Sequence, residues 1–381
     1  MNVLIVSPAF PPFSGVGGQR MASFSKHLIK HGVNVHVLRN EPSLWGEKNL
    51  KADVPSGLTI TDIKADQDFK GNAKIYYEAI KSVLNSQPVD IILYSVGPFY
   101  TLLTLRLIKR HYPHKQVIDF RDLWSYEQRG SKVWLTDLKY RIVQFLFRWI
   151  ERPAVNQADG IVVVTPGDAA IMRKHYPKYR DTIFTIFNGY DEVDLKAVQS
   201  SNAKSAFQLV SLGKLGYYAP HLAKRLFDAL DAMSFTHPSV KLLHVGQKEA
   251  VVETLLPEVK HFTYECTGYV DYSKGLQLAA MSDVGVIVYD HPTGYGTKIF
   301  DYIAVNKPIL LITDKAKDLS DLVLTMKNGF VCRSTEETLN ALQTIVSQKI
   351  TNLDDRQNRE QFSRSTQNQR YLELLHQLLE Q

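Results

Sequence analysis

Short apolar runs recur along the chain and alternate with stretches of helical periodicity. Five runs lie in the first half, at residues 2–7, 33–38, 89–95, 116–120 and 160–165, and five in the second, at 207–213, 240–246, 283–289, 308–313 and 329–332. Strands this apolar, alternating with helices, are typical of parallel sheets that are covered on both faces. The pattern predicts an α/β protein of two doubly wound, Rossmann-like domains that face a cleft.

A polar stretch of small residues, 196–206, separates the two series and predicts the domain boundary. We therefore expect one domain over residues 1–195 and a second over 196–365. The remaining residues, 366–381, form a predicted helix that packs back toward the first domain. Its expected apolar face holds Tyr371, Leu374, Leu375, Leu378 and Leu379.

The first apolar run leads into the segment "SPAFPPFSGVGGQRMASF". Its prolines, Pro8, Pro11 and Pro12, bar helix and sheet, so a loop is expected there. Its glycines, Gly15, Gly17 and Gly18, permit positive φ and close approach of the backbone to another group. Helical spacing begins at Gln19, and a helix N-terminus placed after such a loop suits phosphate.

Two other interpretations of this glycine loop remain open. A dinucleotide fingerprint requires a third glycine, but Arg20 stands there, and the nearest acid after the second strand is Glu41. A tight turn without a ligand is the simpler alternative.

Composition and cysteine content narrow the class of protein. The chain is 44% hydrophobic and 22% charged, which is ordinary for a globular protein, and no apolar run approaches the roughly 20 residues of a membrane helix. It begins directly with a strand, so no signal peptide is expected. Cys266 and Cys332 are too few and too far apart for a disulfide framework or a zinc site, and they indicate a reducing compartment.

The positive charge is concentrated in one window. Residues 101–150 hold ten Lys and Arg against four Asp and Glu, which accounts for the whole formal net charge of +6, and they are rich in aromatic residues. No nucleic-acid motif accompanies this charge. An anionic membrane surface suits Trp, Tyr and basic residues better, and a solvated basic helix with an aromatic core side is the alternative.

A second glycine loop, "HPTGYGTKIFDY", precedes a predicted helix. The backbone N–H groups of Thr297 and Lys298 could hold phosphate there, with the Lys298 ammonium adding charge. Asp301, one turn further, could accept a hydrogen bond from a ribose hydroxyl. The alternative is a turn whose acid favours the helix dipole.

At this point the sequence resembles the glycosyltransferases of the GT-B fold, and specifically glycosyltransferase family 4. The resemblance rests on the order of five segments: "PAFPPFSGVGGQR", "IFNGYDEVD", "SLGKLGYY", "CTGYVDYSKGLQLAAMSDVGVIVY" and "TGYGTKIFDYIAVNKPIL". It implies an acceptor-side first domain, a second domain that binds a nucleotide sugar, and transfer with retention at the anomeric carbon.

The resemblance also implies roles for particular residues. Lys214, after Gly213, stands where an arginine usually contacts the donor diphosphate, without the bidentate fork of arginine. Asp301 stands at a ribose ligand. Gly17 and Gly18 stand where the backbone approaches the donor phosphate or the acceptor. The other implied donor contacts are Tyr269, Val270, Thr293, Gly296, Thr297 and Lys298.

Three positions depart from the family pattern. Thr293 replaces a glutamate that contacts sugar hydroxyls, and a second basic residue after Lys214 is missing unless Lys224 or Arg225 supplies it. Arg121 stands where the family carries a histidine. In the segment "DFRDLW" either Asp119 or Asp122 could supply a carboxylate, and either could instead form a structural ion pair with Arg121. We expect the catalytic group to comprise Asp122, Arg121 and Lys214.

These features together predict a cytoplasmic glycosyltransferase that moves a sugar from a nucleotide donor to a glycan or lipid-linked acceptor, in contact with the inner face of the membrane. No cofactor is expected. No metal is expected either, because the resemblance implies that Lys or Arg and helix N-termini stabilise the diphosphate, and nucleic acid is not an expected partner. The alternatives are a nucleotide-sugar epimerase of the same fold and a nucleotide-binding scaffold without turnover.

Overall fold

The computed structural model describes residues 1–46, 52–126, 134–195, 206–235, 237, 239–256, 261–353 and 359–381. The chain divides into two compact units, Met1–Phe187 together with Gln367–Gln381, and Asn188–Thr366. We expected the second domain to begin at residue 196, whereas the division of the structure falls at Asn188. Residues 196–205 lie outside the described residues.

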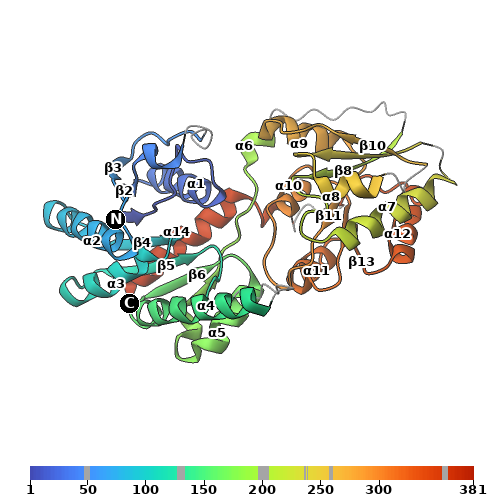
Figure 1. Ribbon diagram of the computed structural model, residues 1–381. Coiled ribbons are helices and arrows are strands. Elements are labelled where there is room, and N and C mark those ends of the chain that lie inside the picture. The colour runs from blue at the N-terminus through green and yellow to red at the C-terminus, as the bar shows by residue number, and fades with distance from the viewer. Residues whose placement is uncertain are drawn as a thin grey trace. The chain divides into compact units, whose positions relative to one another are not determined.

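The first unit is built on a parallel sheet of seven strands in the order β3-β2-β1-β4-β5-β6-β7 (Figure 1). The strands are β1 (Asn2–Val6), β2 (Asn34–Asn40), β3 (Thr59–Ile63), β4 (Ile91–Val96), β5 (Lys115–Phe120), β6 (Gly160–Val163) and β7 (Ile183–Thr185). The helices are α1 (Val16–Lys30), α2 (Phe69–Ser86), α3 (Tyr100–His111), α4 (Trp134–Val155), α5 (Pro166–His175) and α14 (Arg364–Glu380), of which the last begins in the second unit.

Alternation along the strands divides the core of this unit in two. Leu4 and Val6 pack in one cluster with residues of α2, α3, α4 and α5. Val3 and Ile5 point to the other face of β1 and pack with residues of α1 and α14. Both faces of the sheet are thus buried, which is why its central strands are almost purely apolar.

The second unit contains a parallel sheet of six strands in the order β10-β9-β8-β11-β12-β13. The strands are β8 (Phe207–Leu212), β9 (Val240–Val245), β10 (Thr263–Cys266), β11 (Val284–Val288), β12 (Ile309–Ile312) and β13 (Gly329–Cys332). The helices are α6 (Glu192–Leu195), α7 (Pro220–Ser234), α8 (Ala250–Leu255), α9 (Tyr272–Met281), α10 (Lys298–Ala304), α11 (Lys317–Leu324) and α12 (Thr335–Ser347). Residues of α7, α8 and α12 form one core cluster with the strands.

The prediction of two doubly wound α/β units is confirmed. All ten predicted strands are present, and the sequence pattern missed β3, β7 and β10. Each of these three lies at the edge of its sheet. An edge strand has less of its surface covered, so it does not require the continuous apolar run by which the central strands were found.

Two local expectations were wrong, namely the start of the first helix at Gln19 and the apolar face of the last helix. The first helix begins at Val16, so Gly17 and Gly18 lie in its first turn, and neither has a positive φ. In α14, Leu372 is buried, whereas Leu379 is 39% exposed. Within the described part of the chain, no helix combines the length and apolarity needed to cross a membrane.

Candidate functional site

The loop that follows β8 in the second unit is held by two buried side chains. Gly213 turns the chain with φ +69°, and its carbonyl accepts from Nε2 of His244 at 2.7 Å. The Glu249 carboxylate accepts from the backbone N–H groups of Leu215 and Gly216, at 2.8 and 2.9 Å. Burial lowers the pKa of His244, which agrees with a neutral ring whose Nδ1 accepts from the Tyr264 hydroxyl at 2.8 Å. The sequence prediction missed both residues.

Lys298, the first residue of α10, reaches this same loop. Its Nζ donates to the backbone carbonyl of Lys214 at 2.7 Å. Burial lowers the pKa of Lys298 to about 8, although the carboxylates of Glu249 and Asp301 act in the opposite direction. The Lys214 ammonium lies 4.7 Å from the ring centroid of Tyr217. Two lysines predicted to contact the donor therefore meet at the carboxyl end of the second sheet.

The residue predicted to bind the ribose and the loop predicted to border the base are joined by a hydrogen bond in the structure. Asp301 is 8% exposed, and its Oδ1 accepts from the Tyr272 hydroxyl at 2.6 Å. Tyr272 opens α9 directly after the loop that carries Tyr269 and Val270, and Tyr269 is 75% exposed. The structure thus joins this loop to the start of α10.

The start of the glycine loop before α10 is held by two side chains that precede it. The Thr293 carbonyl accepts from the Tyr289 hydroxyl at 3.3 Å and from Nδ1 of His291 at 2.7 Å. Thr297 is the exposed residue that precedes α10. A Cβ added to Gly296 would meet nothing within 4 Å, so no steric demand of the protein itself requires glycine there.

In the first unit, Arg121 follows β5 and lies against the glycine loop. Its Nε and Nη2 face the carbonyls of Val96 and Gly97, at 3.3 and 3.4 Å. A Cβ on Gly17 would overlap the Arg121 guanidinium, and one on Gly18 would overlap the Ala9 carbonyl. Glycine is therefore used at these two positions for close approach rather than for positive φ.

The two candidate carboxylates beside Arg121 have different environments. Asp119 is completely buried, and its Oδ2 accepts from Arg20, at 3.1 Å from Nε and 3.0 Å from Nη2, and from the Tyr371 hydroxyl at 3.1 Å. Asp122 is exposed. Only Asp122 of the two lies where an external molecule can reach it.

The loop that carries Arg121 and Asp122 is held by Glu151 of α4, through the hydroxyl of Ser125. The sequence prediction also missed Glu151. Glu151 is completely buried and accepts from the Ser125 hydroxyl at 2.5 Å and the Tyr176 hydroxyl at 2.8 Å. Arg148 donates to the Ser125 carbonyl at 2.9 Å. Burial raises the pKa of Glu151.

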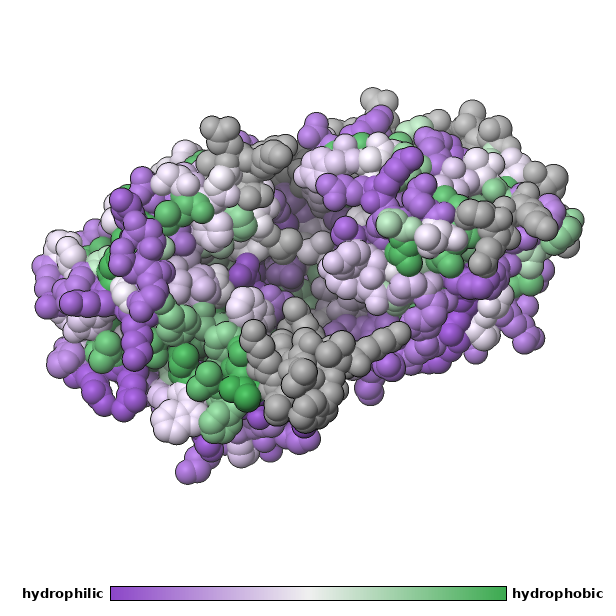
Figure 2. Space-filling model, in the orientation of Figure 1, coloured by the Kyte–Doolittle hydropathy of each residue, from purple (hydrophilic) through white to green (hydrophobic). Residues whose placement is uncertain are grey.

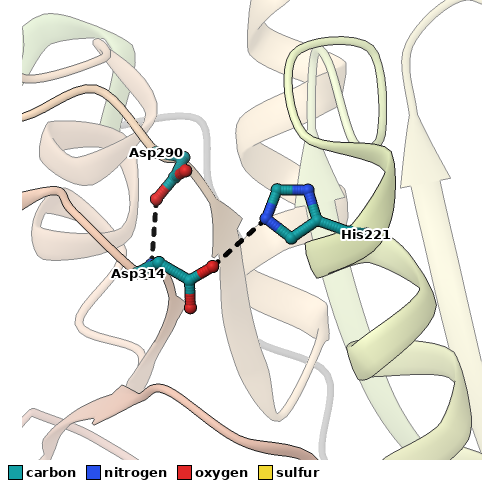
Figure 3. A group of neighbouring side chains, drawn as sticks. All are labelled: His221, Asp290 and Asp314. Atoms are coloured by element: carbon teal, nitrogen blue, oxygen red, sulfur yellow. Dashed lines mark hydrogen bonds and ion pairs between the residues drawn. The ribbon is translucent and has the colours of Figure 1, made fainter.

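The two basic residues that could replace the missing donor contact are both in ion pairs. Lys224 pairs with Asp228 at 2.9 Å, and Arg225 pairs with Asp314 at 2.9 Å. Figure 3 shows His221 reaching from α7 toward Asp314, with Asp290 beside it. Their ligand atoms lie within 4.8 Å of one another, as a metal site would require.

This group is already satisfied without an ion. Arg225 lowers the pKa of Asp314, and His221 lies 3.2 Å from the other oxygen of that carboxylate. Asp290 accepts from the backbone N–H groups of Asp314 and Lys315, at 2.9 and 2.8 Å. The cluster is therefore a partly exposed ion-pair network.

Comparisons with known proteins agree with this architecture. The family model described as Glycosyltransferase Family 4 matches residues 17–193. The sucrose-phosphate synthase of Thermosynechococcus elongatus is 14% identical with a TM-score of 0.71, over 100% of this chain and 99% of that one. HepE of Anabaena in complex with UDP is 14% identical with a TM-score of 0.69, over 99% of this chain and 100% of that one.

A third solved structure with the same architecture is a different kind of enzyme. The UDP-GlcNAc 2-epimerase of Methanocaldococcus jannaschii is 12% identical with a TM-score of 0.59, over 99% of this chain and 100% of that one. No curated protein sequence gives a match.

The fold is that of the GT-B class, with two doubly wound α/β units. Residues 17–193 match glycosyltransferase family 4, which confirms the resemblance drawn from the sequence motifs.

Proposed function

We propose that the protein is a retaining hexosyltransferase that needs no metal and no cofactor. It moves a sugar from a nucleotide-diphosphate donor to a glycan or lipid-linked acceptor, in the synthesis of a surface polysaccharide or glycoconjugate. HepE, whose fold is similar, was solved with UDP and with UDP-glucose, which supports uracil as the base of the donor.

One observation carries this proposal, the hydrogen bond between the Lys298 ammonium and the Lys214 carbonyl. It places the Lys298 ammonium against the backbone of the loop that carries Lys214, at the carboxyl end of a parallel sheet, where ligands of such folds bind. A departing nucleoside diphosphate develops negative charge, and preorganised positive groups directed at that charge are usually the largest catalytic contribution. Asp301 is suited to a ribose hydroxyl, and Tyr269 and Val270 border the base.

On the acceptor side we assign Arg121 and Asp122, together with the backbone of Gly17 and Gly18. During transfer the bond from the anomeric carbon to the diphosphate oxygen breaks, and a bond to the acceptor oxygen forms on the same face of the sugar. The acceptor proton leaves to the diphosphate or to Asp122, which is the exposed carboxylate of this loop. Arg121 holds an anionic or hydroxyl group of the acceptor.

A transfer assay tests the assignment. The protein is incubated with common nucleotide sugars and a broad acceptor set, release of nucleoside diphosphate is measured with and without EDTA, and the anomeric configuration of the product is read by NMR. Acceptor-dependent release that EDTA leaves unchanged, with a retained anomer, is expected. An inverted product or a metal requirement would contradict the corresponding part of the proposal.

The epimerase likeness gives a second candidate function. An epimerase would convert the donor sugar without any acceptor, and the same NMR experiment would detect the new sugar. A scaffold would bind the nucleotide without turnover, and the departures at Thr293 and Arg121 are the features that favour it.

A further inference from the structure

A pocket of about 410 Å³ opens between α2 and α3 on the first unit. Four basic residues line it, Lys70 and Lys74 from α2 and Arg106 and Arg110 from α3, together with the apolar parts of Tyr77 and Leu107. No function proposed above uses this pocket. It combines positive charge with an apolar wall, which suits an anion that carries an apolar group.

The four cations of the pocket are not neutralised by the protein. Counting only residues that the structure describes, none of the four has a carboxylate within 4.0 Å. The acid next along α2, Glu78, pairs instead with Lys81 at 3.8 Å. Four like charges around one pocket repel each other, and a bound anion would relieve that repulsion.

The neighbouring helix α4 exposes an apolar face. Ile142, Phe145, Leu146 and Trp149 are spaced as one side of a helix and are 54%, 58%, 56% and 71% exposed. The opposite side of α4 is buried in the core of the unit through residues such as Ala154 and Val155. The aromatic residues of this helix thus divide between the core, where Phe147 packs, and the surface, where Phe145 and Trp149 lie.

The pocket and the apolar face lie on the same side of the sheet. Residues of α2, α3 and α4 share one core cluster, and α3 contacts both of the other helices. Figure 2 shows apolar side chains gathered over α3 and α4 next to hydrophilic ones. Arg141 and Arg152 of α4 are also exposed, so the apolar face has a basic border.

We infer that the α2–α3 pocket binds the phosphate headgroup of an anionic membrane lipid while the exposed face of α4 enters the membrane interface. Charge complementarity selects this occupant, because the cations of the pocket match a lipid phosphate and aromatic side chains such as Trp149 favour the interfacial region. The inference deepens the proposed function, since it rests on a lipid-linked acceptor presented at the inner face of the membrane.

Flotation with vesicles tests the inference directly. The full chain should bind vesicles of phosphatidylglycerol and phosphatidylcholine, fail to bind phosphatidylcholine alone, and dissociate as salt shortens the screening length. Arg106→Ala/Arg110→Ala should lower the partition coefficient by about 30-fold, because each basic residue near an anionic leaflet contributes about a fivefold factor. Trp149→Ala should weaken binding at high and low salt alike.

Two matched variants separate the pocket from general attraction. Lys26→Ala/Lys30→Ala removes two exposed charges from α1, which covers the other face of the sheet, and should leave binding unchanged. Arg141→Ala/Arg152→Ala removes two charges beside the apolar face but outside the pocket, and should weaken binding less than the pocket variant does. A loss from Arg141→Ala/Arg152→Ala equal to that from Arg106→Ala/Arg110→Ala would overturn the pocket as a specific site.

Other outcomes also decide the question. Absence of binding to anionic vesicles at low salt overturns the inference. Binding of single-stranded RNA in preference to vesicles also overturns it, as does a concentration-dependent dimer that Trp149→Ala abolishes.

Calorimetry with UDP distinguishes failure of this inference from failure of the proposed function. Vesicle binding without nucleotide binding contradicts the proposed function alone, and nucleotide binding without vesicle binding contradicts this inference alone.

Discussion

Arg20 and Asp119 form a buried ion pair in which two guanidinium nitrogens, Nε and Nη2, donate to the same carboxylate oxygen. Arg20 also donates to the Phe187 carbonyl at 2.8 Å, and the Phe187 N–H donates to Gln367 at 2.8 Å. The pair therefore ties the first turns of α1 and the end of β5 to the two places where the chain enters and leaves the first unit. This arrangement gives Asp119 a structural role.

Removing one partner of this pair should destabilise the first unit strongly. Arg20→Ala leaves the Asp119 carboxylate buried without its cation, and we expect a loss of about 3–5 kcal/mol in the free energy of unfolding. Tyr371→Phe removes one further donor to that oxygen and should cost about 1.5–3 kcal/mol. Denaturant unfolding measures both. Additive effects in the double variant would show that the two donors do not share Asp119.

The two adjacent glycines of α1 should respond differently to alanine. Gly17→Ala displaces the flexible end of Arg121, so the free energy of unfolding should change by no more than about 1 kcal/mol. Transfer activity should fall, because Arg121 is moved, while UDP affinity stays unchanged. Gly18→Ala meets the Ala9 backbone and should destabilise by about 1–3 kcal/mol. Thermal unfolding, calorimetry and an activity assay distinguish the two variants.

Lys298 should make nucleotide binding depend on pH. Its pKa is about 8, so the side chain is charged below that pH and becomes neutral above it. The affinity for UDP measured by calorimetry should therefore fall as the pH rises through about 8. Lys298→Arg should remove this dependence while keeping the charge.

Truncation of Lys298 should weaken nucleotide binding directly. Since a hydrogen bond to a charged group contributes about 1.5–3 kcal/mol, Lys298→Ala should lower UDP affinity by roughly 10- to 150-fold. Lys317→Ala, which removes an exposed lysine of α11, is the matched control and should bind UDP normally. Unchanged affinity of the Lys298 variant would argue against the donor site.

Glu249 should matter through the loop that it holds rather than through the nucleotide. Glu249→Ala leaves the buried N–H groups of Leu215 and Gly216 without their acceptor, which costs about 1–3 kcal/mol for each group. A lowered melting temperature and weaker UDP binding are expected together. Glu253→Ala, at an exposed position of α8, is the control and should change neither quantity.

Glu151 should make stability depend on pH with the sign opposite to that of a carboxylate whose pKa an ion pair lowers. Burial raises its pKa in the folded protein, so the unfolded chain loses this proton first and the free energy of unfolding falls as the pH rises above the unfolded value of 4.5. Glu151→Gln removes that fall. The difference in stability between the variant and the wild type, measured by denaturant unfolding across pH, should grow with pH in favour of the variant.

The sequence by itself determined the two-unit α/β architecture and ten of the strands, all except β3, β7 and β10. A strand buried on both faces is apolar along nearly its whole length, so "VDIILYS" and "PILLIT" are recognisable as strands from the sequence alone. The order of the glycine segments likewise indicated the family. The short edge strands β3, β7 and β10 carry no such requirement, and only pairing with a neighbour makes them strands.

The tertiary structure alone decided which polar residues act together. Glu249 lies far along the chain from the N–H groups that it accepts from, and Asp119 finds Arg20 and Tyr371 from two other parts of the chain. It also decided how the glycines are used, because Gly17 is required by the guanidinium of Arg121 and not by its own φ. Hydrogen bonds and close contacts depend on positions in space, and the local periodicity of the sequence does not indicate which distant residue makes them.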